Sequence, residues 1–286
     1  MSSNLKEVLR FRELLLSMVE RELRIRYKNS VIGVFWSLLN PLIVVLVLTL
    51  VFKFFKGNET PNLSAYILAA YLPYMFFQMA VLDSAQSILQ QLPLIKKIYF
   101  PRELLPLSAI IANFLHFLVA LGVFFVYLLV IAVLFPSDFA FSQYLWVLPI
   151  LLVINLALAL GVGFIVSALN TFYEDVKYIV TVLLYLLFFL SPIFYFAEDV
   201  WYAPRLQGPY HELIFFLFNL NPIAALCTAY RKSLLPLQPV FVQGEAMDPL
   251  PFMWGFLGLS AAVSFGLLFF GYWMFNRLKW KFVERP

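Results

Sequence analysis

The chain has 286 residues, of which 63% are hydrophobic and 13% charged, and its formal net charge is +4. Soluble domains carry roughly 25% charged residues, so this composition excludes a sizeable aqueous domain and predicts one membrane domain. The single cysteine, Cys227, excludes an internal disulfide, and no Cys and His cluster has metal-ligand spacing, so no metal is expected.

Residues 1–30 are expected to form an amphipathic helix on the cytoplasmic membrane surface. A helical wheel separates an apolar face from a charged one. The apolar face holds Leu5, Val8, Leu9, Leu15, Leu16, Val19 and Leu23, and the charged face holds Lys6, Arg10, Glu13, Glu20, Arg21, Arg24 and Lys28. The segment is too charged for a cleavable signal peptide. Arg24, Arg26 and Lys28 either anchor the helix to anionic lipids or also bind the anionic head of a substrate, because Arg binds phosphate through paired donors.

Seven stretches without Asp, Glu, Lys or Arg follow, each close to or above the roughly 20 residues that cross a bilayer as a helix. Both ends of the chain are rich in Lys and Arg, which places them in the cytoplasm and requires an even number of crossings. The stretch 213–230 is the shortest and is interrupted by Asn and Pro, so it is expected to be a re-entrant hairpin within 205–236. The predicted fold class is an all-α membrane protein. Its membrane domain covers 31–276, with six spans near 31–53, 64–86, 104–134, 145–169, 178–196 and 252–275, and 277–286 form a cytoplasmic tail.

Residues 26–42, RYKNSVIGVFWSLLNPL, resemble the start of the permease subunits of ABC-2 type exporters for polysaccharides and polyol phosphates, which include O-antigen, capsule and teichoic acid permeases. The resemblance continues in the family's order through PLIKKIYFPRELLPL, NTFYEDVKY, LSPIFY and LNPIAALCTAYR. It implies a homodimer in the bacterial cytoplasmic membrane with two cytoplasmic ATPase subunits, which bind ATP and Mg. It also implies a chain without catalytic residues, cofactor or nucleic acid partner. The missing G-x-x-x-x-G-K-[ST] phosphate loop agrees with this expectation.

The segment between Pro93 and Pro101 is a candidate contact with the ATPase. It has room for about two helical turns, and in the family this loop is the coupling helix. A loop on the membrane surface is the alternative. The predicted contact residues are Ile95, Lys96, Lys97, Ile98, Tyr99 and Phe100. Glu174 and Asp175 form a second predicted contact, and a solvated turn is the alternative there.

Aromatic residues make up 19% of the chain and are the candidates for handling a sugar polymer. Aromatic faces can stack on sugar rings while Tyr and Trp supply hydrogen bonds. In the family, spans one, two and five border the channel near the dimer axis. The predicted lining is Phe35, Trp36, Tyr71, Tyr74, Phe77, Tyr185, Phe188 and Phe189. Contact with lipid or with neighbouring helices is the alternative for each of them.

Asp83 and His116 are the only ionisable candidates inside the predicted spans, and each is expected to make a helix contact instead of forming a proton relay. The predicted function is therefore that of an ATP-driven permease for a lipid-linked polysaccharide or polyol-phosphate polymer. An ABC-2 exporter of another lipid or a drug is one alternative. A membrane-embedded glycan transferase is a second, and it would need convergent acids, a His pair or a metal site. The motifs do not distinguish O-antigen, capsule and teichoic acid.

Overall fold

The computed structural model describes residues 10–27, 33–55, 60–92, 100–134, 141–242 and 245–283, and these are almost entirely helical. The long helices are α3 (Gly33–Leu50), α4 (Leu63–Gln90), α6 (Leu104–Leu134), α7 (Leu148–Phe172), α8 (Asp175–Leu190) and α12 (Trp254–Leu278). Shorter elements are α2 (Arg12–Tyr27), η1 (Val51–Phe55), η2 (Leu145–Val147), α9 (Ala197–Trp201), η3 (Pro204–Leu206), α10 (His211–Leu220), α11 (Pro222–Leu234), the antiparallel strands β1 (Val240–Val242) and β2 (Glu245–Met247), and η4 (Lys279–Val283).

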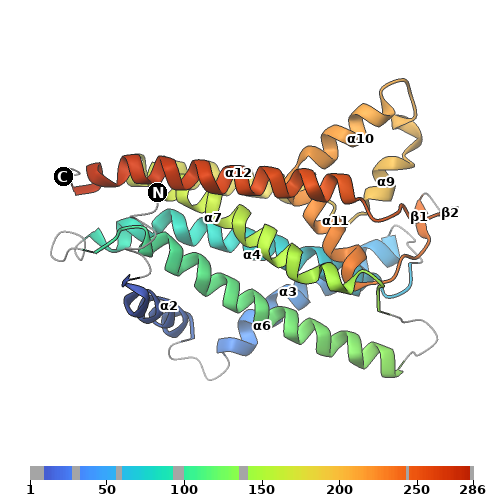
Figure 1. Ribbon diagram of the computed structural model, residues 1–286. Coiled ribbons are helices and arrows are strands. Elements are labelled where there is room, and N and C mark those ends of the chain that lie inside the picture. The colour runs from blue at the N-terminus through green and yellow to red at the C-terminus, as the bar shows by residue number, and fades with distance from the viewer. Residues whose placement is uncertain are drawn as a thin grey trace.

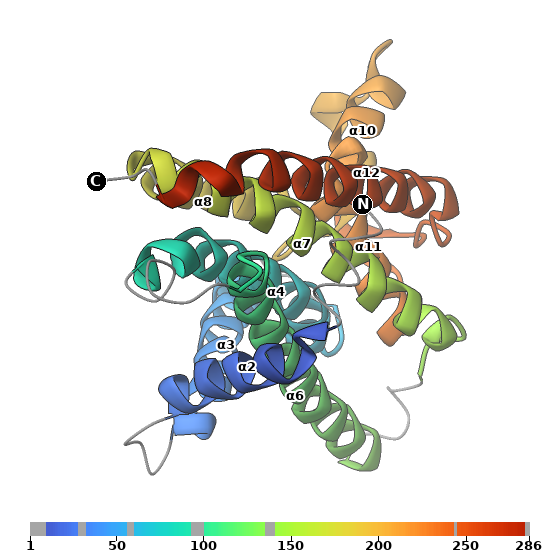
Figure 2. The ribbon, with the colours of Figure 1, turned by 60° about the vertical axis from the view of Figure 1, so that its left-hand side comes forward.

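The long helices lie lengthwise beside one another (Figures 1 and 2). α4 packs against α6 and α7, and α7 packs along α12. α2 and the C-terminal end of α12 lie at one end of the molecule, whereas α9, α10 and the β1–β2 hairpin lie at the other (Figure 1). We call these the α2 end and the α10 end.

Among the described residues, four helical segments are long and apolar enough to cross a membrane: Leu63–Gln90, Leu104–Val133, Leu145–Phe172 and Trp254–Phe282. The apolar segment Leu39–Phe54 is shorter, and α8 has 16 residues. The arrangement is compatible with the predicted six spans. α8 ends at Leu190, before the expected boundary at 196, because Pro192 disfavours helical geometry in the residue before it and cannot donate a backbone hydrogen bond.

α10 and α11 are bent by 90° where they meet, as expected for either a re-entrant hairpin or a broken span. Asn221 sits at the bend, and its side chain accepts a hydrogen bond of 3.0 Å from the backbone N–H of Ile223. Pro222 then occupies the first helical position, where no backbone donor is needed. The residues that interrupt this apolar stretch are therefore the ones that start α11.

Two glycines let α7 and α12 approach closely. A Cβ atom on Gly161 would lie 2.6 Å from the backbone carbonyl carbon of Leu267, and one on Gly271 would collide with the carbonyl oxygen of Gly161. Small residues serve this purpose in membrane bundles, because helix association there depends on van der Waals packing.

Candidate functional site

Polar contacts fasten α2 to the ends of α4 and α6. Arg26 Nη2 donates to Asp83 Oδ2 at 2.7 Å and to Asn113 Oδ1 at 2.9 Å. Asn113 Nδ2 in turn donates to the same Asp83 oxygen at 2.8 Å. Arg21 Nη1 donates to Gln91 Oε1 at 3.2 Å. Asp83 is thus a helix contact, as expected, and sequence analysis missed its partner Arg26.

The predicted head-binding residues differ in their surroundings. Arg24 is exposed and pairs with Glu20 one turn earlier on α2, whereas Arg26 is largely enclosed by α4 and α6. Lys28 lies outside the described residues. Leu16, which the helical wheel places on the apolar face, is 65% exposed in the single chain. Val19 of the same face is buried, and so is Met18, which packs in a small core that includes Ile88 and Leu105. α2 therefore packs on protein with one side and leaves part of its apolar face uncovered in the single chain.

The predicted lining aromatics fall into three groups. Tyr74 and Phe77 are buried within the bundle, and the Tyr74 hydroxyl donates to the carbonyl oxygen of Leu184. Tyr71 and Phe188 are half-buried and meet edge to face, with ring centroids 6.2 Å apart.

The third group is exposed. Tyr185 and Phe189 are 60% and 61% exposed, and Tyr178 and Val182 lie on the same side of α8 at helical spacing and are exposed too. We call these four residues the α8 stripe. Phe35 and Trp36 belong to α3, but the structure does not describe their side chains.

Two predicted cytoplasmic contacts lie at the α2 end. Glu174 and Asp175 are exposed at the start of α8. Phe100 is buried in the small core, so its side chain anchors the chain within the protomer and is not available for docking. The other predicted contact residues, Ile95, Lys96, Lys97, Ile98 and Tyr99, lie outside the described residues.

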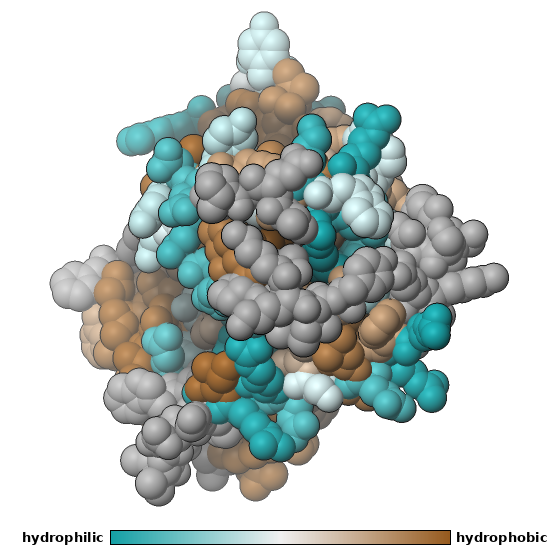
Figure 3. All heavy atoms as spheres, turned by 90° about the vertical axis from the view of Figure 1, so that its left-hand side faces the viewer, coloured by the Kyte–Doolittle hydropathy of each residue, from teal (hydrophilic) through white to brown (hydrophobic). Residues whose placement is uncertain are grey.

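The segment after α12 braces this end. Lys279 Nζ forms a buried ion pair with Glu103, and Arg102 donates to the backbone carbonyl oxygen of Lys279. Phe282 is fully buried, and its ring packs against that of Phe172, with 5.7 Å between centroids. The segment after α12 therefore touches the chain just after the first predicted contact segment, at Arg102 and Glu103, and just before the second, at Phe172. In Figure 3, which faces this end, hydrophilic side chains gather around smaller apolar areas.

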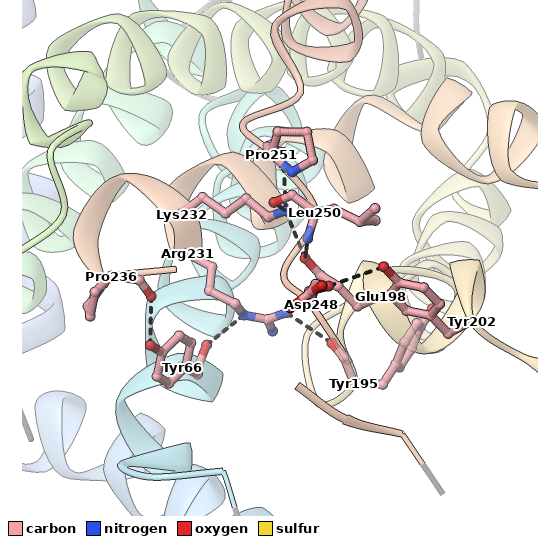
Figure 4. A network of polar contacts seen from close by, with 10 residues as sticks. All are labelled: Tyr66, Tyr195, Glu198, Tyr202, Arg231, Lys232, Pro236, Asp248, Leu250 and Pro251. Atoms are coloured by element: carbon pink, nitrogen blue, oxygen red, sulfur yellow. Dashed lines mark hydrogen bonds and ion pairs between the residues drawn. The ribbon is translucent and has the colours of Figure 1, made fainter. Parts of the chain in front are cut away.

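Arg231 forms the core of a polar network near the α10 end (Figure 4). Its guanidinium donates to the carbonyl oxygens of Tyr66, Pro192, Ile193 and Tyr195 at 2.9–3.0 Å. It also lies 4.5 Å from the ring centroid of Phe196. Backbone carbonyls thus satisfy a buried cation, and we call them the carbonyl cage.

The neighbouring residue, Lys232, makes a second buried contact. Its Nζ lies 2.8 Å from Glu198 Oε1 and donates to the carbonyl oxygen of Leu250 at 2.6 Å (Figure 4). The sequence alone assigned no role to Arg231 or Lys232. The only available signal was that Arg231 is the last residue of the motif LNPIAALCTAYR and that Lys232 directly follows it.

The sequence profile of the ABC-2 type transporter family matches residues 13–234 of this chain. The chain belongs to this family. An O-antigen export system permease protein RfbA of Klebsiella pneumoniae is 27% identical over 272 residues, which cover 95% of this chain and 94% of the relative. A protein of the same name from Myxococcus xanthus is 29% identical over 283 residues, covering 98% and 97%.

Membership confirms the predicted family and the predicted all-α membrane fold. The protein is an ABC-2 type permease, a membrane-embedded transport subunit of a family that works with an ABC ATPase. No group of three or more His, Cys, Asp or Glu residues suited to a metal occurs in the described part of the chain.

Proposed function

We propose that this permease carries a lipid-linked polysaccharide of the O-antigen type across the bacterial cytoplasmic membrane, driven by ATP hydrolysis in a partner ATPase. The observation that carries the proposal is the similarity to two O-antigen export permeases over nearly the whole length of each chain. That similarity favours O-antigen-type glycans over teichoic acid. The complex would contain two copies of this chain and two ATPases, with both termini in the cytoplasm.

The sequence supports an external energy source. It contains no phosphate loop of the G-x-x-x-x-G-K-[ST] type, so ATP and Mg would be bound by the partner. The exposed Glu174 and Asp175 at the α2 end, together with residues 95–99, are the proposed contacts with it. The braced Glu103 would hold the end of the first contact loop in place.

Among the basic residues, Arg24 is better suited than Arg26 to collect a phosphate-bearing head. Exposed ion pairs such as Arg24–Glu20 are worth at most about 1 kcal/mol, so a phosphate can replace the carboxylate at little cost. Arg26 is held by two side chains and fixes α2. Lys28 remains a proposed companion of Arg24.

The α8 stripe is the proposed surface along which sugars pass. Its aromatic faces are unburied in the single chain, and ring stacking on sugars is individually modest and tolerant of register. Tyr71, Phe188, Phe35 and Trp36 would extend the surface toward the dimer axis. Tyr74 and Phe77 would support it from within the bundle.

A complementation experiment tests the proposal. A strain lacking the gene should keep its lipid-linked glycan inside, and the wild-type chain should restore surface glycan, measured by immunoblotting of intact cells. Tyr185→Ala with Phe189→Ala should reduce export and shorten the exported chains. Leu129→Ala with Val133→Ala, on the exposed face of α6, is the matched control and should export normally.

Equal export by both double variants would contradict the aromatic path. Normal surface glycan in the deletion strain would contradict the proposed substrate and would favour another lipid or a drug. Glycan transfer by the purified chain would favour a transferase.

A further inference from the structure

A polar cavity of about 260 Å³ lies between α2, the last turns of α4 and the first turns of α6. Two cations, Arg21 and Arg26, and two carboxylates, Glu22 and Asp83, line it together with the amide of Gln86 and the hydroxyl of Ser87. The lining charges sum to zero, so the cavity suits neither a bare anion nor a bare cation.

Several of these groups have unused hydrogen-bonding capacity. Arg26 uses Nη2 for Asp83 and Asn113, while its Nη1 is buried and has no hydrogen-bond partner within the described structure. An unsatisfied donor on a buried charged group is costly, and an incoming acceptor would remove that cost. Glu22 makes no hydrogen bond or ion pair to the residues that the structure describes. Within the described structure, Arg26 Nη1 and the Glu22 carboxylate are therefore both available to hydrogen-bond with a ligand.

The place of the cavity points to a membrane lipid. It lies behind an amphipathic helix at one end of the bundle, and that helix still exposes Leu16 and Ile25 beside its charged residues. Such a helix lies at the level of lipid headgroups. The apolar side chains of Met18 and Leu105 share the lining and would meet the glycerol region of a lipid.

The lining also argues against a sugar. No aromatic side chain of the described residues lines the cavity, so a sugar ring would find no stacking surface. The volume is below the roughly 300–1,000 Å³ of sites for drug-sized ligands. A small lipid headgroup that carries one negative and one positive charge a few atoms apart fits the cavity better.

We propose that this cavity binds the phosphoethanolamine head of a phospholipid. The phosphate would accept hydrogen bonds from Arg21 and from Arg26 Nη1, and the ammonium group would donate to Glu22 and to the second oxygen of Asp83. A bound head would tie α2 to α4 and α6 from the membrane side. The proposal does not depend on the exported substrate.

The test is thermal unfolding of the purified full-length chain in detergent, titrated with short-chain phosphatidylethanolamine, phosphatidylcholine or phosphatidylglycerol. The ethanolamine lipid should raise the unfolding midpoint most. The choline head has the same charges but no N–H donors for Glu22, and the glycerol head has no cation. Glu22→Gln should abolish the preference for ethanolamine, and Arg21→Gln should weaken the response to all three lipids.

Glu13→Gln is the matched control, since Glu13 is exposed on α2 and does not line the cavity. It should respond like the wild type. Equal responses to the three lipids, an unchanged preference in Glu22→Gln, or the same loss in Glu13→Gln would overturn the proposal. Soluble phosphoethanolamine should act more weakly than the lipid, and an equal effect would refute a membrane source. A larger shift with lipid-linked glycan than with phosphatidylethanolamine would assign the cavity to the substrate instead.

Discussion

Replacing Gly161 by alanine should separate α7 from α12. The new methyl carbon would lie 2.6 Å from both the carbonyl carbon of Leu267 and the nitrogen of Leu268. Comfortable carbon contacts lie at about 3.5–4.0 Å, so the helices must part by roughly 1 Å or bend. Both clashing atoms are backbone, so no rotamer change can relieve them. Overpacking of this kind costs about 1–3 kcal/mol.

Gly266→Ala on α12 is the matched control, since nothing lies within 4 Å of the added carbon. That variant should be neutral or gain up to about 1 kcal/mol, because Ala is the better helix former. The stability of both variants can be measured by equilibrium unfolding in mixed micelles with increasing dodecyl sulfate, with circular dichroism as the readout. If Gly161→Ala is as stable as Gly266→Ala, the close contact of the two helices does not exist in the protein.

The remaining predictions concern the buried charges and the membrane topology. Arg231→Lys keeps the charge but loses the fork of donors. The free energy of unfolding should fall by about 2–4 kcal/mol, because each charged hydrogen bond that is lost costs about 1.5–3 kcal/mol. An unchanged free energy of unfolding would contradict the carbonyl cage. Glu103→Gln and Lys279→Met should each cost about 3 kcal/mol or more, because each leaves a buried charge unpaired. The double variant should cost less than the sum of the two, and strict additivity would show that the pair is not formed. The cysteines introduced by Pro209→Cys and Gln238→Cys should both react with an impermeant thiol reagent added outside cells. Labelling of only one of the two positions would mean that α10 and α11 cross the membrane.

The helices could be predicted because a helix that crosses a bilayer needs about 20 apolar residues, and stretches of that length are visible in the sequence. The expected span 104–134 has the bounds of α6, and the expected hairpin 213–230 falls on α10 and α11. The end of α8 was missed, because apolar residues continue beyond Leu190 while the chain has already left the helix.

The polar contacts of the site could not be predicted in the same way. The partners of Arg26 lie 57 and 87 residues away along the chain, and no periodic pattern connects them. The partners of Arg231 are backbone oxygens, which every residue possesses, so no side chain reveals them. Phe100 looked like a docking residue because it ends a short amphipathic segment between Pro93 and Pro101, but its side chain packs in the small core instead.

The carbonyl cage also places an unusual limit on how the segment 192–195 can change. Arg231 contacts three of its backbone oxygens, so side chains there can be exchanged without touching the bonds themselves. Inserting or deleting a single residue would shift those oxygens by about 3.3–3.6 Å along an extended chain, beyond hydrogen-bond reach. In homologues with this arginine, the length of the segment should therefore be more constant than its composition.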